Sequence, residues 1–245
     1  MHASAQDQLI RLLISNGYLR SPRIIEAFYA IDRADFVLSE DKKEAYGNYP
    51  LPIGMGQTIS RPVTVAFMLE ALDPQPGEKI LDIGSGSGWT TALLAYVVSQ
   101  KNFHGQRINS NIKENNYGKV FAVDRIPEIC KFGDENIQKY HFIEKGIVSI
   151  FCKDGTEGLP EYALFDKILT GAAASKNIPE AWRNQLKTGG RIVAPVDNSV
   201  WLFIKKSSVS GGASSKDQWE EKEFPGFMFV PLISNKLAVS LPAHE

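Results

Sequence analysis

The stretch KILDIGSGSGW, residues 79–89, determines the fold expected for this chain, because an apolar run passes directly into alternating glycines. The run is typical of a buried parallel strand, and TTALLAYVV at 90–98 continues as a helix. Gly84, Gly86 and Gly88 therefore form a tight strand-to-helix connection. Glycine adopts positive φ without steric cost, and without a Cβ it lets a ligand lie against the backbone at the positively polarised helix start. The pattern predicts a ligand-binding turn.

The spacing of the glycines narrows the kind of ligand. A phosphate-binding P-loop ends in Gly-Lys-Ser/Thr, whereas Trp89 follows Gly88 here. A dinucleotide fingerprint has its third glycine one residue later than Gly88. The remaining pattern, Asp-x-Gly-x-Gly-x-Gly from Asp82, with Ser85 inside the turn, resembles the first motif of class I S-adenosylmethionine-dependent methyltransferases. The alternative at this point is a glycine-rich turn that binds no ligand.

Composition favours one large α/β domain without a polyanionic partner. The chain has 245 residues. It contains 27 Lys and Arg and 28 Asp and Glu, so its net charge is -1. No strong field then draws it to nucleic acid or anionic lipid. The longest apolar helix is far shorter than the roughly 20 residues that span a bilayer, and the start of the chain does not resemble a signal peptide. We expect a soluble, cytoplasmic monomer without nucleic-acid or membrane partners.

Cysteine and histidine spacing predicts neither a disulfide nor a metal site. Cys130 and Cys152 are distant in sequence and form no Cys-x-x-Cys pair, so we expect two core thiols of a reducing compartment. The histidines are scattered without the spacing of metal ligands.

The first fifty residues are predicted to be helical. The expected inward faces are Leu9, Ile10, Leu12 and Leu13 in one helix and Ile24, Ile25, Phe28 and Ile31 in the next. Ser21 and Pro22 mark the start of the second helix. The segment 49–62 is a proline- and glycine-rich connection, and Pro62 opens a further helix.

From residue 79 onward, strand-like and helical stretches alternate, which indicates a parallel sheet with helices on both faces. The predicted elements are strands at 119–124, 147–151, 165–169 and 191–196, and helices near 127–140 and 179–187. Apolar runs at 200–204 and 224–232 predict a closing antiparallel hairpin joined by the polar loop 205–223. The polar segment 100–118 is interpreted as an inserted surface loop.

Two further acids follow predicted strands. Asp124, after the second strand, is placed to accept hydrogen bonds from both hydroxyls of a ribose, and bonds to a charged group contribute roughly 1.5–3 kcal/mol each. Asp154, after the third strand, is a candidate acceptor for an adenine amino group. A turn-forming Asp-Gly with Gly155 explains Asp154 equally well, and Asp82 can instead cap its own turn.

The resemblance becomes specific when the upstream segment is added. The string PLPIGMGQTIS at 50–60, the glycine turn, FDKILTGAAA, LKTGGRIVAPV and FVPLI resemble the protein-L-isoaspartate O-methyltransferase family over nearly the whole chain. Generic methyltransferases share only the glycine turn. The chain departs from the family's common pattern at Val63, where His or Tyr is frequent, and at Asp197, where Gly is frequent.

The resemblance implies a fold, a reaction and site residues. The fold is a doubly wound, mostly parallel seven-stranded sheet, with an N-terminal extension and acceptor-side loop at 1–60 and the cofactor-binding domain at 61–245. The reaction moves a methyl group from S-adenosylmethionine to the free carboxylate of L-isoaspartyl residues in damaged proteins, and the ester then closes to a succinimide. The implied cofactor residues are Asp82, Gly84, Ser85, Gly86, Gly88, Asp124, Asp154 and Gly155. The implied acceptor residues are Thr58, Ile59, Ser60 and Val230.

The sparse catalytic equipment agrees with this chemistry. An α-carboxyl group has a pKa of about 3.5, so the acceptor is already a nucleophile at neutral pH and needs no general base. Alignment of the reacting atoms then supplies most of the catalysis. Ser60 matches the family's active residue, and we expect it to orient the acceptor carboxylate; the alternative is that it caps the helix opened by Pro62. Two other functions stay open: a carboxyl methyltransferase for a dedicated peptide partner, and a non-catalytic cofactor-binding module.

Overall fold

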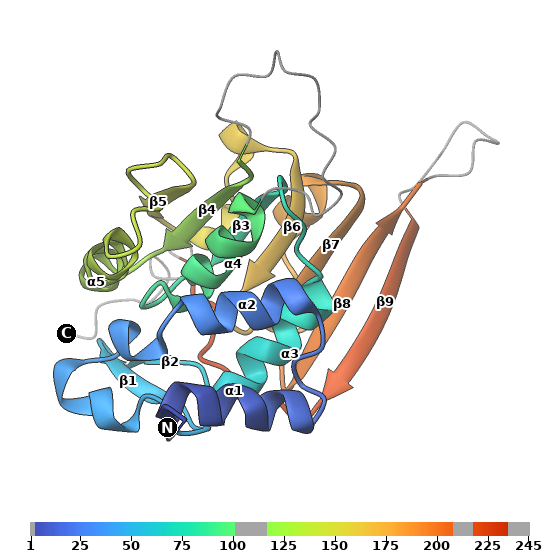
Figure 1. Ribbon diagram of the computed structural model, residues 1–245. Coiled ribbons are helices and arrows are strands. Elements are labelled where there is room, and N and C mark those ends of the chain that lie inside the picture. The colour runs from blue at the N-terminus through green and yellow to red at the C-terminus, as the bar shows by residue number, and fades with distance from the viewer. Residues whose placement is uncertain (1–2, 101–116, 208–217, 235–245) are drawn as a thin grey trace, which may run out of the picture.

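A computed structural model describes residues 3–100, 117–207 and 218–234 of the chain. Its main sheet consists of β3 (Lys79–Ile83), β4 (Lys119–Asp124), β5 (Val148–Cys152), β6 (Phe165–Thr170), β7 (Leu186–Val196), β8 (Ser199–Lys206) and β9 (Gln218–Pro225). The strand order is β5-β4-β3-β6-β7-β8-β9 (Figure 1). Neighbours from β5 to β7 pair in parallel, and β8 and β9 are antiparallel. The fold class predicted from the sequence is confirmed.

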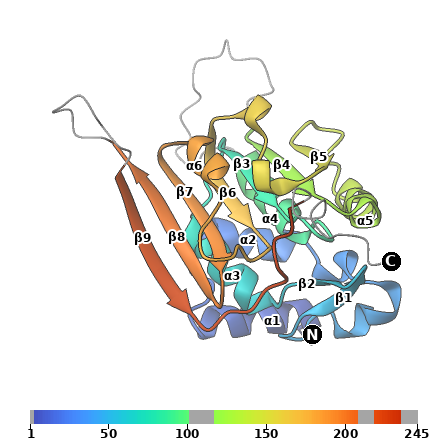
Figure 2. The same ribbon diagram turned by 180° about the vertical axis from the view of Figure 1, so that it is seen from behind.

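Helices cover both faces of this sheet. They are α1 (Ala5–Ser15), α2 (Pro22–Ala30), α3 (Pro62–Leu72), α4 (Trp89–Ser99), α5 (Pro127–Gln138) and α6 (Glu180–Asn184). Figure 1 shows α2, α3 and α4 in front of the strands, and Figure 2 shows α6 on the opposite face. Successive strand residues point to opposite faces. Ile80 accordingly packs in the cluster that contains α1 to α4, and Leu81 packs in the cluster that contains α6.

The N-terminal residues fold onto the same core and differ from the prediction in two places. Leu9, Ile10 and Leu13 are buried, but Leu12 is 51% exposed, because it lies at the edge of the apolar face of α1. The segment 49–62 is more than a connection: β1 (Leu51–Gly54) and β2 (Gln57–Ile59) pair as an antiparallel hairpin. Short strands in a glycine-rich segment give little periodic signal in the sequence.

The C-terminal hairpin is present, but its second strand was placed wrongly at 224–232. β9 is Gln218–Pro225, so β8 and β9 take up both ends of the predicted 205–223 loop. The alternating charged residues of β9 suit an exposed edge strand. The apolar residues that follow instead cross the end of the sheet, where Ala173 N–H donates to Val230 O at 2.8 Å and Leu232 N–H donates to Ala173 O at 2.7 Å.

Smaller predictions also need correction. Cys130 is buried but Cys152 is exposed at the end of β5, so only one of the two free cysteines is a core thiol. The helix predicted at 179–187 is shorter, because Leu186 already pairs in β7. Nearly all of the predicted insertion 100–118 lies outside the described residues.

Two kinds of feature are absent from the described part of the chain. No helix there is long and apolar enough to cross a membrane. No three His, Cys, Asp or Glu residues gather there as potential metal ligands.

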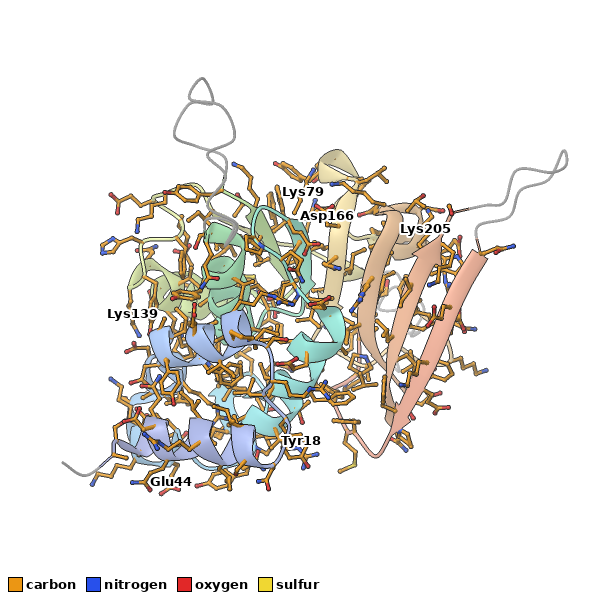
Figure 3. The ribbon with its side chains drawn as sticks, turned by 45° about the vertical axis from the view of Figure 1, so that its right-hand side comes forward. Tyr18, Glu44, Lys79, Lys139, Asp166 and Lys205 are labelled. Carbon is orange, nitrogen blue, oxygen red and sulfur yellow. The ribbon has the colours of Figure 1, made fainter. Side chains whose placement is uncertain are left out.

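The amino ends of the neighbouring strands β3 and β6 are linked by a side chain. Figure 3 shows Lys79 and Asp166 close together there. The backbone N–H of Lys79 donates to Asp166 Oδ2 at 2.8 Å, and Lys187 Nζ lies 2.7 Å from Asp166 Oδ1. Open α/β sheets bind their ligands at the other end of the strands, where the parallel strands have their carboxyl ends.

Candidate active site

A cavity of about 80 Å³ lies at the carboxyl ends of β3 and β4. Of the residues predicted from the sequence, those that line it are Thr58, Gly84, Gly86, Asp124, Gly155 and Val230. The glycine turn and the end of β4 form its inner walls, and segment 230–233 forms part of its outer wall. The structure thus brings together residues from six separate parts of the sequence.

The glycine turn has the backbone geometry that the sequence requires. Gly84, Gly86 and Gly88 have φ angles of 70°, 57° and 89°, a region that residues with a Cβ rarely adopt. Gly88 is also the N-cap of α4, and a Cβ there would lie 2.8 Å from the side chain of Ile137. Gly84 and Gly86 have no Cβ and line the cavity, so their backbone is open to a ligand, whereas Gly88 allows α5 to pack closely against the turn.

Asp124 fixes the glycine turn to the end of β4. Its Oδ2 accepts a hydrogen bond from Gly86 N–H at 3.0 Å, and its Oδ1 accepts from Arg125 N–H at 2.8 Å and Ile126 N–H at 3.2 Å. These backbone donors hold the carboxylate at the cavity wall. Each carboxylate oxygen can accept a further bond, so a diol such as a ribose can be bound here.

Asp82 lies beneath the turn and does not line the cavity. It is 2% exposed, and Thr91 Oγ1 donates to its Oδ2 at 2.6 Å. This bond joins β3 to the first turn of α4. Burial, with a smaller contribution from the charge of Asp124, raises the pKa of Asp82 to about 6, against the lowering effect of the Thr91 bond. The structure thus gives Asp82 a role in positioning α4.

Asp154 and Gly155 follow β5 at the side of the cavity. Asp154 caps the short 3₁₀ turn Gly155–Glu157, and its Oδ1 accepts from Thr156 N–H at 2.9 Å. Its Oδ2 accepts from Ser234 Oγ at 3.1 Å, so it also links this turn to the segment that crosses the end of the sheet. Only Gly155 lines the cavity, and a Cβ on it would lie 2.5 Å from Ile83.

A second, larger cavity of about 390 Å³ adjoins the first. Thr58, Gly171 and Val230 line both, so the two cavities share a wall. The volume lies within the range of about 300–1,000 Å³ found for ligand pockets. Ser60 and Arg61 also line this second space, which we call the acceptor cavity.

Ser60 is not a helix cap. The N-cap of α3 is Arg61, and no side chain caps that helix. The hydroxyl of Ser60 makes no hydrogen bond with the described residues, and the residue lines the acceptor cavity. The alternative explanation for Ser60 as a cap is therefore excluded, and its hydroxyl is available to a ligand.

A buried arginine holds residues 45–60, which we call the acceptor loop, in place. Arg33 is 2% exposed, and its Nη1 donates to Ala45 O at 2.6 Å. Its Nη2 donates to Tyr49 O and Ser60 O, at 3.1 Å each. Burial lowers the pKa of Arg33 to about 10, which leaves it charged at neutral pH. One side chain thus satisfies carbonyl groups on both sides of the β1–β2 hairpin.

Some predicted residues lie outside both cavities, and others were missed. Those outside are Asp82, Ser85, Gly88, Asp154 and Ile59, the last of which is buried in the core. The missed residues include Arg125, Ile126, Gly171 and Ala172 around the first cavity, and Thr64 and Met228 around the acceptor cavity. Arg125 and Ile126 directly follow Asp124, and that adjacency could have indicated them.

The fold and the site together define a class of protein. A parallel sheet with a glycine turn after β3 and a carboxylate after β4 is the arrangement of Rossmann-like methyltransferases. A second cavity with the volume of a ligand pocket adjoins the first.

Comparison with known proteins gives the family. The model of the protein-L-isoaspartate(D-aspartate) O-methyltransferase (PCMT) family matches residues 4–237, and the chain belongs to this family. A protein-L-isoaspartate O-methyltransferase of Methanopyrus kandleri is 36% identical over 95% of this chain and 92% of its own length. One of Aeropyrum pernix is 37% identical over 95% and 80%, respectively. The resemblance stated from the sequence is confirmed.

A solved structure supports the fold. It is a putative protein-L-isoaspartate O-methyltransferase of Plasmodium falciparum in complex with S-adenosyl-L-homocysteine. It matches with a TM-score of 0.76 and 23% identity, covering 96% of this chain and 100% of its own.

Proposed function

We propose that this chain transfers a methyl group from S-adenosylmethionine to the free α-carboxylate of L-isoaspartyl residues in damaged proteins. Family membership over residues 4–237 supports this reaction. The observation that carries the proposal is the shared wall of Thr58, Gly171 and Val230, which sets the glycine-turn cavity directly beside the cavity that holds Ser60. A methyl donor in the first cavity and a carboxylate in the acceptor cavity can therefore meet where the two cavities adjoin.

The residues around the first cavity suit the cofactor. S-adenosylmethionine supplies, when bound, an electrophilic methyl group on a sulfonium. The open backbone of Gly84 and Gly86 would face its amino-acid part, Asp124 would accept from the ribose hydroxyls, and Gly155 would face the adenine. Asp154 would act behind Gly155, by holding the turn that carries it. Segment 230–233 lines one side of this cavity, so it would lie against the bound cofactor.

The acceptor needs orientation more than activation. Its carboxylate is ionised at neutral pH, since α-carboxyl groups titrate at about 3.5. The hydroxyl of Ser60 can donate to one carboxylate oxygen. The other oxygen then faces the adjoining cofactor cavity. Holding both reactants in line can contribute roughly 7–11 kcal/mol to lowering the barrier, and the Ser60 bond would supply a small part of this. We assign Thr58 and Val230, which line both cavities, to the same acceptor side.

The organisation of the chain and its surroundings belong to the proposal as well. We assign residues 1–60 to the acceptor side and 61–245 to the cofactor-binding domain. We infer that the chain needs no nucleic acid or membrane, because a net charge of -1 gives no strong field toward a polyanion. We further propose that it is a cytoplasmic monomer. Light scattering of the purified chain tests the monomer.

The decisive experiment compares an isoaspartyl peptide with its normal aspartyl twin. The expected result is base-labile methyl ester on the isoaspartyl peptide alone. Equal labelling of both peptides would refute the repair function. Labelling of the normal aspartyl peptide alone would indicate an enzyme for a dedicated peptide partner, and cofactor binding without any ester would indicate a non-catalytic module.

A further inference from the structure

Arg61 carries the one charge among the described residues that line the acceptor cavity. Its Nε donates to Thr64 Oγ1 at 2.9 Å, which holds the side chain against the first turn of α3. Within the described parts of the chain no carboxylate lies within ion-pair distance of Arg61. Its guanidinium keeps donors available to a ligand, in contrast to Arg33, whose terminal nitrogens are occupied by carbonyl groups.

The chemistry of methyl transfer argues against a role for Arg61 at the reacting carboxylate. The carboxylate oxygen forms a bond to the methyl carbon, the carbon–sulfur bond breaks, and its electron pair stays on sulfur. A negative carboxylate and a positive sulfonium thus become a neutral ester and a neutral thioether. A cation beside that carboxylate stabilises the ground state more than the transition state, and so slows the reaction. A neutral hydroxyl such as that of Ser60 has a smaller effect of this kind.

A cation in this cavity is better matched to a carboxylate whose charge persists through the reaction. We propose that Arg61 is a specificity residue that selects acceptors with an Asp or Glu next to the isoaspartyl residue. This inference rests on the proposed function and specifies its substrate class. Because the second carboxylate is unchanged by the reaction, the ion pair stabilises ground and transition states equally. It lowers KM and leaves kcat unchanged.

The test uses matched isoaspartyl peptides that carry Glu or Gln beside the isoaspartyl residue, on either flank. With the wild-type chain we expect a KM for the preferred Glu peptide roughly two- to fivefold lower than for its Gln twin, the range of exposed ion pairs, at equal kcat. The KM ratio should fall to about one in Arg61→Gln, and in the wild type at about 1 M salt. Arg61→Lys, which keeps the charge, should retain most of the preference.

Arg11→Gln is the matched control, because it removes the same charge from an exposed position on α1. Arg11→Gln should keep the wild-type ratio of the KM values for the Gln and Glu peptides. The proposal is overturned if the wild type has equal KM values for both peptides, or if Arg61→Gln keeps the preference. It is also overturned if Arg61→Gln raises both KM values equally, which would place Arg61 at the reacting carboxylate. Absence of methyl ester on either peptide would instead refute the proposed function, and this inference with it.

Discussion

The guanidinium of Arg33 links Ser60 to the helix that follows the glycine turn. Its Nη2 donates to Ser60 O at 3.1 Å, and its central carbon lies 5.3 Å from the centre of the Trp89 ring. Trp89 is the first residue of α4. A cation over an indole face is stabilised by roughly 0.5–2 kcal/mol. The acceptor loop and the cofactor-binding turn are therefore held in register by one buried side chain.

Replacing Arg33 with Met should impair the acceptor site more than the cofactor site. The carbonyl groups of Tyr49 and Ser60 lose their donor, and each unsatisfied buried group costs about 1–3 kcal/mol. We expect kcat/KM for an isoaspartyl peptide to fall at least about tenfold, while cofactor affinity by calorimetry changes less. Arg33→Lys should recover part of the loss. Equal losses in both measurements would show that Arg33 only stabilises the fold.

Ser60→Ala removes the one hydroxyl assigned to the acceptor carboxylate. We expect kcat for methyl transfer to fall about tenfold, the equivalent of one oriented hydrogen bond of about 1.4 kcal/mol. Cofactor affinity should stay near the wild-type value. Ser15→Ala, an exposed change in α1, is the control. Normal turnover in Ser60→Ala would contradict the orienting role.

Asp124→Ala should weaken cofactor binding. The carboxylate both holds Gly86 N–H and is the assigned acceptor for the ribose, and each bond to a charged group contributes roughly 1.5–3 kcal/mol. A rise in the dissociation constant of about 10- to 100-fold, measured by calorimetry, is expected. Asp134→Ala on the exposed side of α5 should bind normally. Unchanged affinity in Asp124→Ala would exclude the carboxylate from the cofactor site.

Asp82 should make the free energy of unfolding depend on pH. Its pKa is raised from 3.8 to about 6 in the folded chain, so the folded state binds the proton more tightly than the unfolded state. Stability from this group is present below pH 3.8 and is lost as pH rises to about 6, by about 3 kcal/mol. Denaturant unfolding of wild type and Asp82→Asn across this window measures the difference. If the free energy of unfolding changes with pH in the same way for both proteins, the raised pKa of Asp82 is contradicted.

Gly88→Ala should destabilise the chain more than Gly17→Ala. Both glycines have positive φ, 89° and 74°, so each substitution carries a backbone cost of about 1–2 kcal/mol. A Cβ at Gly17 meets nothing within 4 Å, whereas at Gly88 it lies 2.8 Å from Ile137. The overlap adds about 1–3 kcal/mol. If both variants lose the same free energy of unfolding, in thermal or urea unfolding, the side chain of Ile137 can move aside without cost.

Much of the fold could be predicted from the sequence, because its signals are local. The apolar run at 79–83, the glycines after it and the apolar helix at 90–98 each reflect the conformational preferences of neighbouring residues. The same reasoning failed for 224–232, since an apolar run of that length fits a strand and an apolar strap equally well. Only its contacts with Ala173 distinguish the two.

For this protein the sequence alone determined the glycine turn, the class of cofactor and the mostly parallel pairing of the strands. Tertiary structure decided which residues share a cavity: it placed Val230 and Thr58 around the same space, left Asp82 buried beneath the turn, and gave Ser60 a free hydroxyl. It also decided that Arg33 holds Ser60, 27 residues away. Turn and strand preferences act between neighbours in the chain, whereas these contacts exist only after distant segments have packed together.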